Sequence, residues 1–271
     1  MSGKIICFAN QKGGVGKTTV SFNFAVSLAN RGYRVLVVDL DSQGNLTKYC
    51  GLSNLDGLEY TIGHAIDYVI KNDEMSFGGN FKVYNNRRYE NLRILPANNY
   101  LYDLKPLMLQ ATARESILEE ILDPLRRAFD YIVIDCAPSL DIDLINALVA
   151  ADEVLIVSTP DAFSYDGSEQ LMKSITKVRK RLNSDLEIAG VICNMVDKRN
   201  KFMPAMIDAM RQNWEGKGIA KVFRTEIPKS VRVAESQFQK EPMLSYEEGN
   251  PVTKACESFV DEYLNLQKEG E

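Results

Sequence analysis

Side chains that bind metals or form disulfides are scarce in this sequence. His64 is the single histidine among 271 residues, which is too few for a zinc site of the usual kind. The cysteines are odd in number, contain no C-x-x-C pair, and stand at positions 7, 50, 136, 193 and 256. Three of them lie in apolar, strand-like runs, so we expect buried, reduced thiols and a cytoplasmic protein.

Long apolar runs are also missing. No run reaches the roughly 18 apolar residues of a membrane-spanning helix. The first residues lead directly into a predicted strand, so we expect no signal peptide. Hydrophobic residues nevertheless make up 45% of the chain, which is typical of a globular protein with a sizeable core. The length suits one large α/β domain or two small ones.

Positive charge is in the minority, but it is unevenly distributed. The chain has a net charge of −5, which by itself argues against nucleic-acid binding. Residues 173–240, however, carry 15 Lys and Arg against 7 Asp and Glu. Such an asymmetry can give an acidic protein a basic face. A solvated helix face remains the alternative for the basic run at 177–181.

The most specific motif follows the first apolar run, at 5–9. Residues 10–19 read NQKGGVGKTT, and a helix-like segment begins near Thr18. A strand, a glycine-rich turn and a helix together bind phosphate through backbone N–H groups and the helix N-terminus. In such a loop Lys17 contacts the β- and γ-phosphates, and the Thr18 hydroxyl is a magnesium ligand. The motif therefore predicts a nucleoside triphosphate site.

The loop departs from the standard pattern at one position. G-x-x-x-x-G-K-[ST] requires glycine at position 11, where this chain has Gln11, followed by Lys12. Residues 12–19 resemble the deviant Walker A motif of the ParA/MinD ATPases. The resemblance implies that Lys12 reaches the nucleotide of a partner subunit. The implied ATP-binding residues of the loop are Lys12, Gly13, Gly14, Val15, Gly16, Lys17, Thr18 and Thr19.

Two further apolar runs end in aspartates. Residues 35–38 lead to Asp39 and Asp41, and residues 131–134 lead to Asp135. The carboxyl ends of buried parallel strands meet at the ligand-binding edge of a sheet. Asp135 fits the Walker B role of holding magnesium. By the resemblance, Asp39 supports the magnesium shell and Asp41 orients or activates the attacking water. The predicted metal set is Thr18, Asp39 and Asp135, and the predicted catalytic set is Lys12, Lys17 and Asp41.

The resemblance also implies a site for the nucleobase of ATP. This chain departs from the family motifs at three positions. Asn194, Pro228 and Ser230 match family positions near the base, although Ser230 replaces an asparagine of the family pattern. Ser42 stands for the proline of D-x-D-P-Q-G-N, so we expect a less rigid loop. Ala137 stands for the first proline of T-P-P-S, in the loop that senses the nucleotide, so we expect its switching to differ.

A DNA-binding surface is implied by three basic residues. Arg199 and Arg232 match positions where ParA relatives of the Soj type carry arginines that bind DNA without sequence preference, and Lys229 lies near Arg232 in the chain. Phosphate contacts of this kind give affinity and salt dependence but no base readout. Arginines that pair with acidic neighbours are the alternative.

Alternating strands and helices predict an α/β fold, a doubly wound and mostly parallel sheet flanked by helices. We expect one P-loop ATPase domain over 1–271, with a variable region at 52–100 and no N-terminal helix-turn-helix domain. Residues 72–91 suit a hairpin or an exposed loop, and Thr112 to Glu115 suits a capping box. The other expected strands are 92–96, 154–157, 188–193 and 221–227; the expected helices are 18–29, 61–70, 112–129, 164–182 and 251–271.

The family resemblance implies a function as well. We expect a magnesium-dependent ATPase, slow by itself, that forms an ATP-dependent homodimer on non-specific DNA and is associated with the nucleoid. A ParB-like centromere-binding protein would stimulate hydrolysis during partition of chromosome or plasmid DNA. The alternatives are a MinD-like membrane-cycling positioner, a positioner of non-DNA cargo, and a scaffold that binds ATP without stimulated turnover. Acidic residues close the 251–271 segment, so we expect no membrane partner, and a nitrogenase-type reductase would need paired cysteines.

Overall fold

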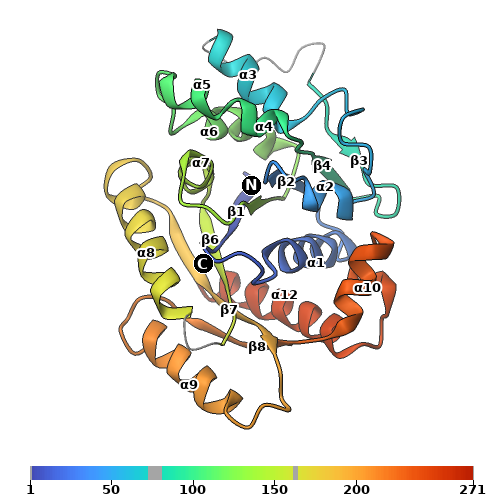
Figure 1. Ribbon diagram of the computed structural model, residues 1–271, viewed down its shortest axis with the longest axis vertical. Helices are drawn as coiled ribbons and strands as arrows, with labels where there is room; N and C mark the ends of the chain where they lie inside the picture. The colour runs from blue at the N-terminus through green and yellow to red at the C-terminus, as the bar shows by residue number, and fades with distance from the viewer. Residues whose placement is uncertain (1, 73–80, 161–163, 271) are drawn as a thin grey trace.

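The computed structural model describes residues 2–72, 81–160 and 164–270, and its centre is an eight-stranded sheet (Figure 1). The spatial order is β3-β4-β2-β5-β1-β6-β7-β8. Neighbouring strands run parallel except β3 and β4, which are antiparallel. The sheet confirms the predicted doubly wound, mostly parallel α/β fold. The strands are β1 (Lys4–Ala9), β2 (Val35–Leu40), β3 (Tyr84–Asn85), β4 (Leu92–Leu95), β5 (Tyr131–Cys136), β6 (Glu153–Ser158), β7 (Glu187–Val196) and β8 (Val222–Pro228).

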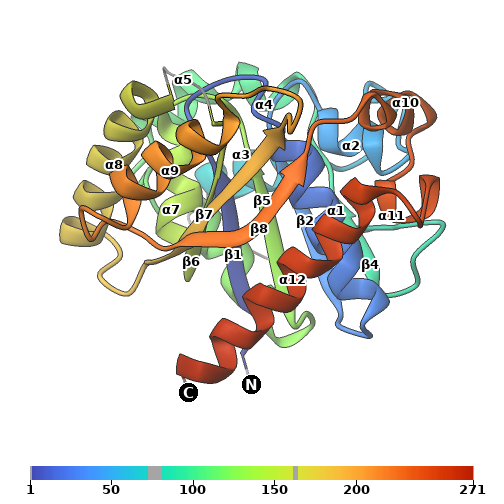
Figure 2. The ribbon, with the colours of Figure 1, turned by 90° about the horizontal axis from the view of Figure 1, so that it is seen from below.

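Helices cover both faces of the sheet (Figure 2). Because neither face meets water, the central strands read as continuous apolar runs rather than alternating ones. One face packs against α1 (Lys17–Asn30), α2 (Asn45–Tyr49), α11 (Met243–Tyr246) and α12 (Pro251–Gly270). The other packs against α3 (Ile62–Asn72), α4 (Tyr100–Asp103), α5 (Lys105–Gln110), α6 (Ile117–Leu122), α7 (Ile142–Ala150), α8 (Ser164–Arg181) and α9 (Met203–Trp214). The remaining helix, α10 (Val231–Gln239), follows β8.

Helix α1 is enclosed between the sheet and α12. The Phe24 ring lies 5.2 Å from Phe8 of β1, 5.4 Å from Phe259 and 5.1 Å from Tyr263 of α12, measured between ring centroids. Since nearly every residue of α1 is buried, it is a helix of the core rather than one laid on a surface. The phosphate loop thus leads into one of the most buried helices of the molecule.

The predicted helix at 112–129 is wrong as a single element. Residues 112–116 form turns, in which Ala113 has φ 50°. Helix α6 begins after Ser116, not Thr112, so the expected capping box does not form. The chain then changes to a 3₁₀ helix at Asp123–Arg127. Pro124, near the start of that turn, lacks an N–H and cannot continue an α-helical ladder.

The other sequence-based element predictions agree with the structure to within a few residues. The predicted helices at 18–29, 61–70 and 164–182 correspond to α1, α3 and α8, and α12 covers 251–270 of the last one. Part of the 72–91 segment forms β3, paired with β4 as an edge strand, while residues 73–80 lie outside the described part of the chain. In the described residues, no helix is long and apolar enough to cross a membrane.

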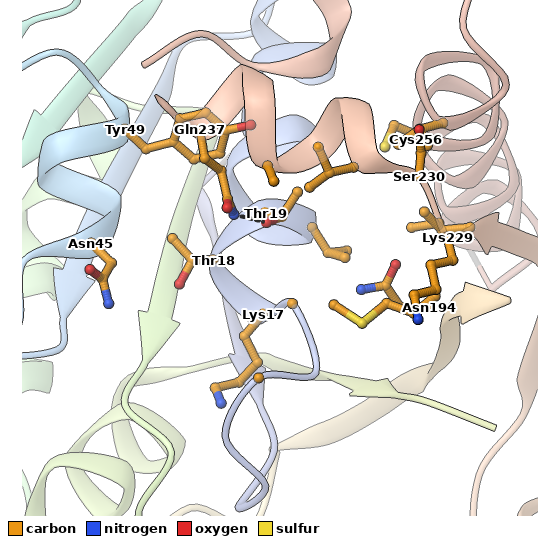
Figure 3. A pocket seen from close by; sticks show the side chains of 18 of the residues that line it. Lys17, Thr18, Thr19, Asn45, Tyr49, Asn194, Lys229, Ser230, Gln237 and Cys256 are labelled. Carbon is orange, nitrogen blue, oxygen red and sulfur yellow. Dashed lines mark hydrogen bonds between the residues drawn. The ribbon is translucent and has the colours of Figure 1, made fainter. Parts of the chain in front are cut away.

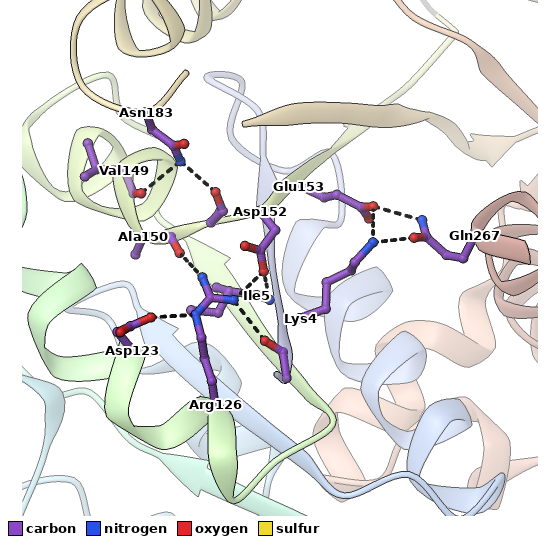
Figure 4. Close-up of polar contacts among 12 residues, drawn as sticks. Lys4, Ile5, Asp123, Arg126, Val149, Ala150, Asp152, Glu153, Asn183 and Gln267 are labelled. Carbon is purple, nitrogen blue, oxygen red and sulfur yellow. Dashed lines mark hydrogen bonds and ion pairs between the residues drawn. The ribbon is translucent and has the colours of Figure 1, made fainter. Parts of the chain in front are cut away.

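Polar contacts join the chain's two ends at the amino edge of the sheet (Figure 4). Glu153, at the start of β6, accepts hydrogen bonds from Lys4 Nζ (2.7 Å), Gln267 Nε2 (2.9 Å) and Tyr263 Oη (2.7 Å). Lys4 also bonds Gln267 directly. The last turns of α12 are therefore fastened to the first strand. The opposite, carboxyl edge carries the predicted site residues.

Candidate functional site

Two asparagines, Asn10 and Asn194, hold the phosphate-binding loop in place, and Figure 3 labels Asn194. Asn10 is buried, donates from Nδ2 to the Val157 carbonyl (2.6 Å) and accepts from the Lys12 amide (2.9 Å). Asn194 donates from Nδ2 to the Val15 carbonyl (2.7 Å). The loop is thus attached to β6, the neighbour of β1 in the sheet, and to β7, the next strand beyond it. This prepares the loop for a ligand without a change in the loop itself.

Two glycines allow the loop's backbone path. Gly14 and Gly16 have φ of 75° and 88°, in the left-handed region that glycine tolerates best. A Cβ on Gly16 would lie 2.3 Å from Asn194 Nδ2. Gly16 is also the N-cap of α1, and no side-chain hydrogen bond caps that helix end in the described structure. Backbone N–H groups at such an end bind anions.

Lys17 enters the site from the first turn of α1. Its side chain is largely buried, and its Nζ donates to the Lys12 carbonyl at 3.4 Å. Burial lowers the pKa of Lys17, while the neighbouring Asp135 carboxylate acts in the opposite direction. A phosphate group would supply the negative charge that a buried ammonium needs. The position of Lys17 therefore suits phosphate binding.

Asp135 places a buried carboxylate at the end of β5. It is 1% exposed at the end of β5, and neither carboxylate oxygen has a hydrogen-bond partner among the described residues. Burial and Asp39 raise its pKa to about 7, whereas the nearby Thr18 and Lys17 lower it. An unpaired buried charge is costly unless a cation joins it. With the Thr18 hydroxyl beside it, this oxygen donor set fits a magnesium ion.

Both carboxylate oxygens of Asp39 accept hydrogen bonds from neighbouring residues. It is fully buried, and its Oδ2 accepts from the Thr47 amide (2.8 Å) and the Thr47 hydroxyl (2.7 Å). Its Oδ1 accepts from the Asp41 amide at 3.2 Å. Burial raises the pKa of Asp39 to about 6. These contacts orient the segment that carries Asp41, so a direct metal contact by Asp39 stays a prediction.

A cavity of about 670 Å³ opens in front of the loop. Its size falls within the range of small-molecule sites. Predicted residues that line it are Gly14, Gly16, Lys17, Thr18, Thr19, Asp41, Asn194, Pro228, Lys229 and Ser230. The structure thus brings residues from the first and last thirds of the sequence together around one cavity. Residues that line the cavity and were missed from the sequence include Asn45, Tyr49, Pro138, Met195, Gln237 and Cys256.

Comparisons with known proteins agree with this arrangement. A family model described as an AAA domain matches residues 3–188. The sporulation initiation inhibitor protein Soj of Bacillus subtilis is 36% identical, with 96% of each chain covered. The chromosome partitioning protein ParA of Myxococcus xanthus is 34% identical over 95% of this chain and 86% of that protein. The chain belongs to the ParA/MinD family of ATPases.

Solved structures resemble this ParA/MinD-family ATPase over its whole length. Cobyrinic acid a,c-diamide synthase from Mycobacterium smegmatis, with an ATP analogue and magnesium bound, superposes with a TM-score of 0.82. It is 26% identical and covers 99% of this chain and 97% of its own. An ATP complex of McdA from Cyanothece has a TM-score of 0.81 at 24% identity over 97% of each chain, which shows a shared fold alone.

The far end of the cavity is formed by β7, β8 and α10. Met195 follows Asn194 with φ 59°, a left-handed conformation that is uncommon for a non-glycine residue. Ser230 caps α10 by accepting from the Arg232 amide at 3.2 Å. Gln237, two turns into α10, donates to the Thr19 hydroxyl at 2.7 Å. The bond attaches α10 to α1 beside the loop, so α10 forms a wall of the cavity in front of the loop.

Asp41, Lys12 and Gly13 lie on the more open side of the loop. Asp41 lines the cavity, and its Oδ1 accepts from the Gln43 amide at 2.9 Å. Lys12 and Gly13 are exposed. The Lys12 amide donates to Asn10 Oδ1, which fixes the backbone at this position. The side chain of Val15, which also belongs to the loop, is by contrast buried.

The arginines predicted to bind DNA both form ion pairs within the chain. Arg199 contacts Asp197 (Nη2–Oδ2 2.8 Å), although its side chain is 87% exposed. The guanidinium lowers the pKa of Asp197 to about 2. Arg232 contacts Glu235 at 2.7 Å. Because β7 pairs with β8 at Val196 and Pro228, both arginines follow neighbouring strand ends at the carboxyl edge. Phosphates there would compete with the carboxylates.

Proposed function

We propose that this ATPase partitions DNA. Bound to magnesium and ATP, it forms a homodimer that binds DNA without sequence preference, and a ParB-like partner stimulates hydrolysis and release. The observation that carries the proposal is the similarity over nearly the whole chain to partitioning proteins, Soj and ParA among them. It would act in the cytoplasm on the nucleoid, as one domain over residues 1–271.

The described residues supply each part of a nucleotide site. The loop amides and Lys17 would hold the phosphates, and Thr18 and Asp135 would hold magnesium. When bound, magnesium neutralises charge on the transferred phosphoryl group. Asp41 would orient the attacking water at the cavity edge. Asn194, Pro228 and Ser230 would border the base, as three residues of the cavity wall.

Lys12 supports the dimer part of the proposal. It is exposed and stands outside the set of side chains that line its own chain's cavity. A lysine placed there can extend toward the nucleotide of a second copy that faces the first. Two such lysines would complete two sites across one interface, so nucleotide binding and dimerisation would be coupled.

The carboxyl edge supports the DNA part. Arg199, Lys229 and Arg232 all follow the ends of β7 and β8 and are exposed. Their chain neighbours carry the basic excess of residues 173–240. A DNA phosphate that replaces Asp197 or Glu235 as a partner releases counterions, so binding would weaken steeply with salt.

The test is DNA binding by charge-reversal variants in the presence of ATP and magnesium. Arg199→Glu and Arg232→Glu should each weaken binding to random-sequence DNA and flatten its dependence on salt, with ATP affinity unchanged. The matched control is Arg34→Glu, because Arg34 also pairs with an aspartate, Asp130, but lies before β2 at the opposite edge.

Two outcomes would count against the proposal. Unchanged, salt-sensitive DNA binding in both variants would remove these arginines from the interface. ATP-dependent flotation on anionic vesicles by a wild-type protein that ignores DNA would favour the MinD-like alternative instead. ATP turnover measured with and without DNA and the product of a neighbouring gene would then show whether a partner stimulates the enzyme.

A further inference from the structure

Lys105, on α5, connects the region before β5 with the loop that follows Asp135. We propose that Lys105 is a positioning residue for ATP hydrolysis. By binding Asp141 and Asp143 at the start of α7, it holds the loop of residues 137–140 against the phosphate-binding loop. The inference requires the ATPase activity of the family and is independent of DNA binding.

One ammonium group holds two carboxylates. Lys105 Nζ lies 2.7 Å from Asp141 Oδ2 and 2.7 Å from Asp143 Oδ2. The side chain of Lys105 is 23% exposed and that of Asp143 3%. Lys105 Nζ also lies 6.0 Å from the centroid of the Tyr102 ring, within cation–π range. Partial burial strengthens these contacts relative to pairs in open water, so the lysine has one preferred position.

Asp141 transmits the position of Lys105 to the loop. While its Oδ2 contacts Lys105, its Oδ1 accepts from the Ser139 hydroxyl at 2.8 Å. Ser139 follows Pro138, which lines the nucleotide cavity together with Cys136. The chain from Lys105 to the cavity wall therefore passes through two hydrogen bonds and one peptide unit.

The loop of residues 137–140 also lies close to the phosphate-binding loop. A Cβ built on Gly13 would lie 3.9 Å from Pro138 Cβ, an ordinary van der Waals distance. A shift of Pro138 would therefore change the wall next to Gly13 and the access of the γ-phosphate region to water. Displacements of about 1 Å at reacting groups can cost roughly 100-fold in rate.

Charge explains why the lysine is needed. Asp143 is buried, and its Oδ1 has no hydrogen-bond partner among the described residues. Burial raises the pKa of Asp143 to about 6, Lys105 opposes this shift, and the charges of Asp141 and Asp41 add to it. Without Lys105, the carboxylates of Asp141 and Asp143 would repel each other and Asp41 with no cation between them. The start of α7 and the attached loop would then move away from the catalytic aspartate.

The test compares Lys105→Met with Lys105→Arg in basal turnover of Mg-ATP, without DNA or partner. Lys105→Met should lower kcat roughly 10- to 100-fold with KM nearly unchanged, because the loop is misplaced while the phosphate contacts persist. Lys105→Arg should restore most of kcat, since a guanidinium can also bind two carboxylates. Lys71→Met is the control, because Lys71 forms an exposed pair with Asp67 on α3.

A double variant separates positioning from stability. Lys105→Met with Asp143→Leu removes the lysine together with the buried carboxylate that it neutralises. We expect this variant to regain the Tm lost in Lys105→Met but not its kcat, because Asp141 still lacks a cation. Wild-type kcat in Lys105→Met, or recovery of kcat along with Tm in the double variant, would overturn the proposal. Failure of the wild-type protein to bind DNA would refute the partitioning function and leave this result intact.

Discussion

At the scale of single residues, the site depends on groups that the fold leaves incompletely satisfied. Asp135 is buried without a hydrogen-bond partner among the described residues, and Lys17 is buried with a lowered pKa. Each would be costly in an ordinary core. Together, beside Thr18, they form a place where a magnesium–phosphate group would contribute the missing charges. The same residues that weaken the empty protein therefore favour its ligand.

Gly16 offers a test of this residue-scale view. Gly16→Ala should abolish nucleotide binding, because the new Cβ would lie 2.3 Å from Asn194 Nδ2 and would displace the side chain that holds Val15. Gly32→Ala is the matched control: its φ is 91°, and nothing lies within 4 Å of the new Cβ. That control should lose only the cost of a left-handed alanine, roughly 1–2 kcal/mol.

Isothermal titration with an ATP analogue, together with thermal unfolding, checks the pair. The two variants share the backbone strain and differ in the clash. Equal loss of nucleotide affinity in both would mean that the loss in Gly16→Ala does not come from the clash with Asn194.

At the scale of elements, motif and periodicity predicted the sheet and the phosphate-binding loop well. Strands β1, β2 and β5 are continuous apolar runs because both faces of the sheet are covered, and the ends of β2 and β5 carry Asp39 and Asp135. The prediction of one helix at 112–129 was wrong because two features interrupt a pattern that looks periodic. One is the turn at Ala113, and the other is Pro124 in the 3₁₀ helix.

Other parts of the site could not be predicted because they depend on long-range packing. Gln237 bonds Thr19 across 218 positions, and Tyr49 bonds Ser236 across 187. No sequence motif marks either the glutamine or the tyrosine as a cavity residue. Only the helical periodicity of α10, continued from Ser230 by two turns, would have indicated Gln237.

Thr47 offers a test at this scale, because it joins three elements. Its hydroxyl donates to Asp39 of β2 (2.7 Å) and accepts from the Ala97 amide after β4 (2.9 Å), while its own backbone belongs to α2. Thr47→Val should destabilise the fold by about 1–3 kcal/mol, because a buried donor and a buried acceptor lose their partner. It should also lower kcat by loosening the Asp41 segment.

Thr47→Ser, which keeps the hydroxyl, is the control for that change. Denaturant unfolding gives the free energy, and ATP turnover gives the catalytic effect. A Thr47→Val protein as stable as Thr47→Ser would show that these two hydrogen bonds add nothing to the attachment of α2.

At the scale of the whole molecule, the two edges of the sheet carry different features. The amino edge carries the contacts of Glu153 with Lys4, Gln267 and Tyr263. The carboxyl edge carries the cavity, Asp41 and the exposed Lys12. Fastening the amino edge leaves the carboxyl edge available for the proposed binding of a ligand and a second copy of the chain.

Lys12→Ala tests the proposed use of that edge. We expect the variant to bind ATP as a monomer but to lose the ATP-dependent dimer and most of its turnover, because the lysine would act on the partner's nucleotide. Light scattering with a slowly hydrolysed ATP analogue measures the dimer. Gln11→Ala, one residue earlier in the loop, is the neighbouring control and should still dimerise. A Lys12→Ala protein that dimerises normally would assign the lysine to its own site or to none.

The packing of α12 on α1 has a consequence for synthesis of the protein. Phe259 and Tyr263 cover Phe24, and Val252 and Cys256 line the nucleotide cavity, yet all four are translated long after the loop at 10–19. At ~5–20 residues per second, the delay is on the order of ten seconds or more. During that time the apolar side of α1 lacks its cover, and the nascent chain is exposed to aggregation and to chaperones. The first-made part of the enzyme can therefore mature only when nearly all of the chain has left the ribosome.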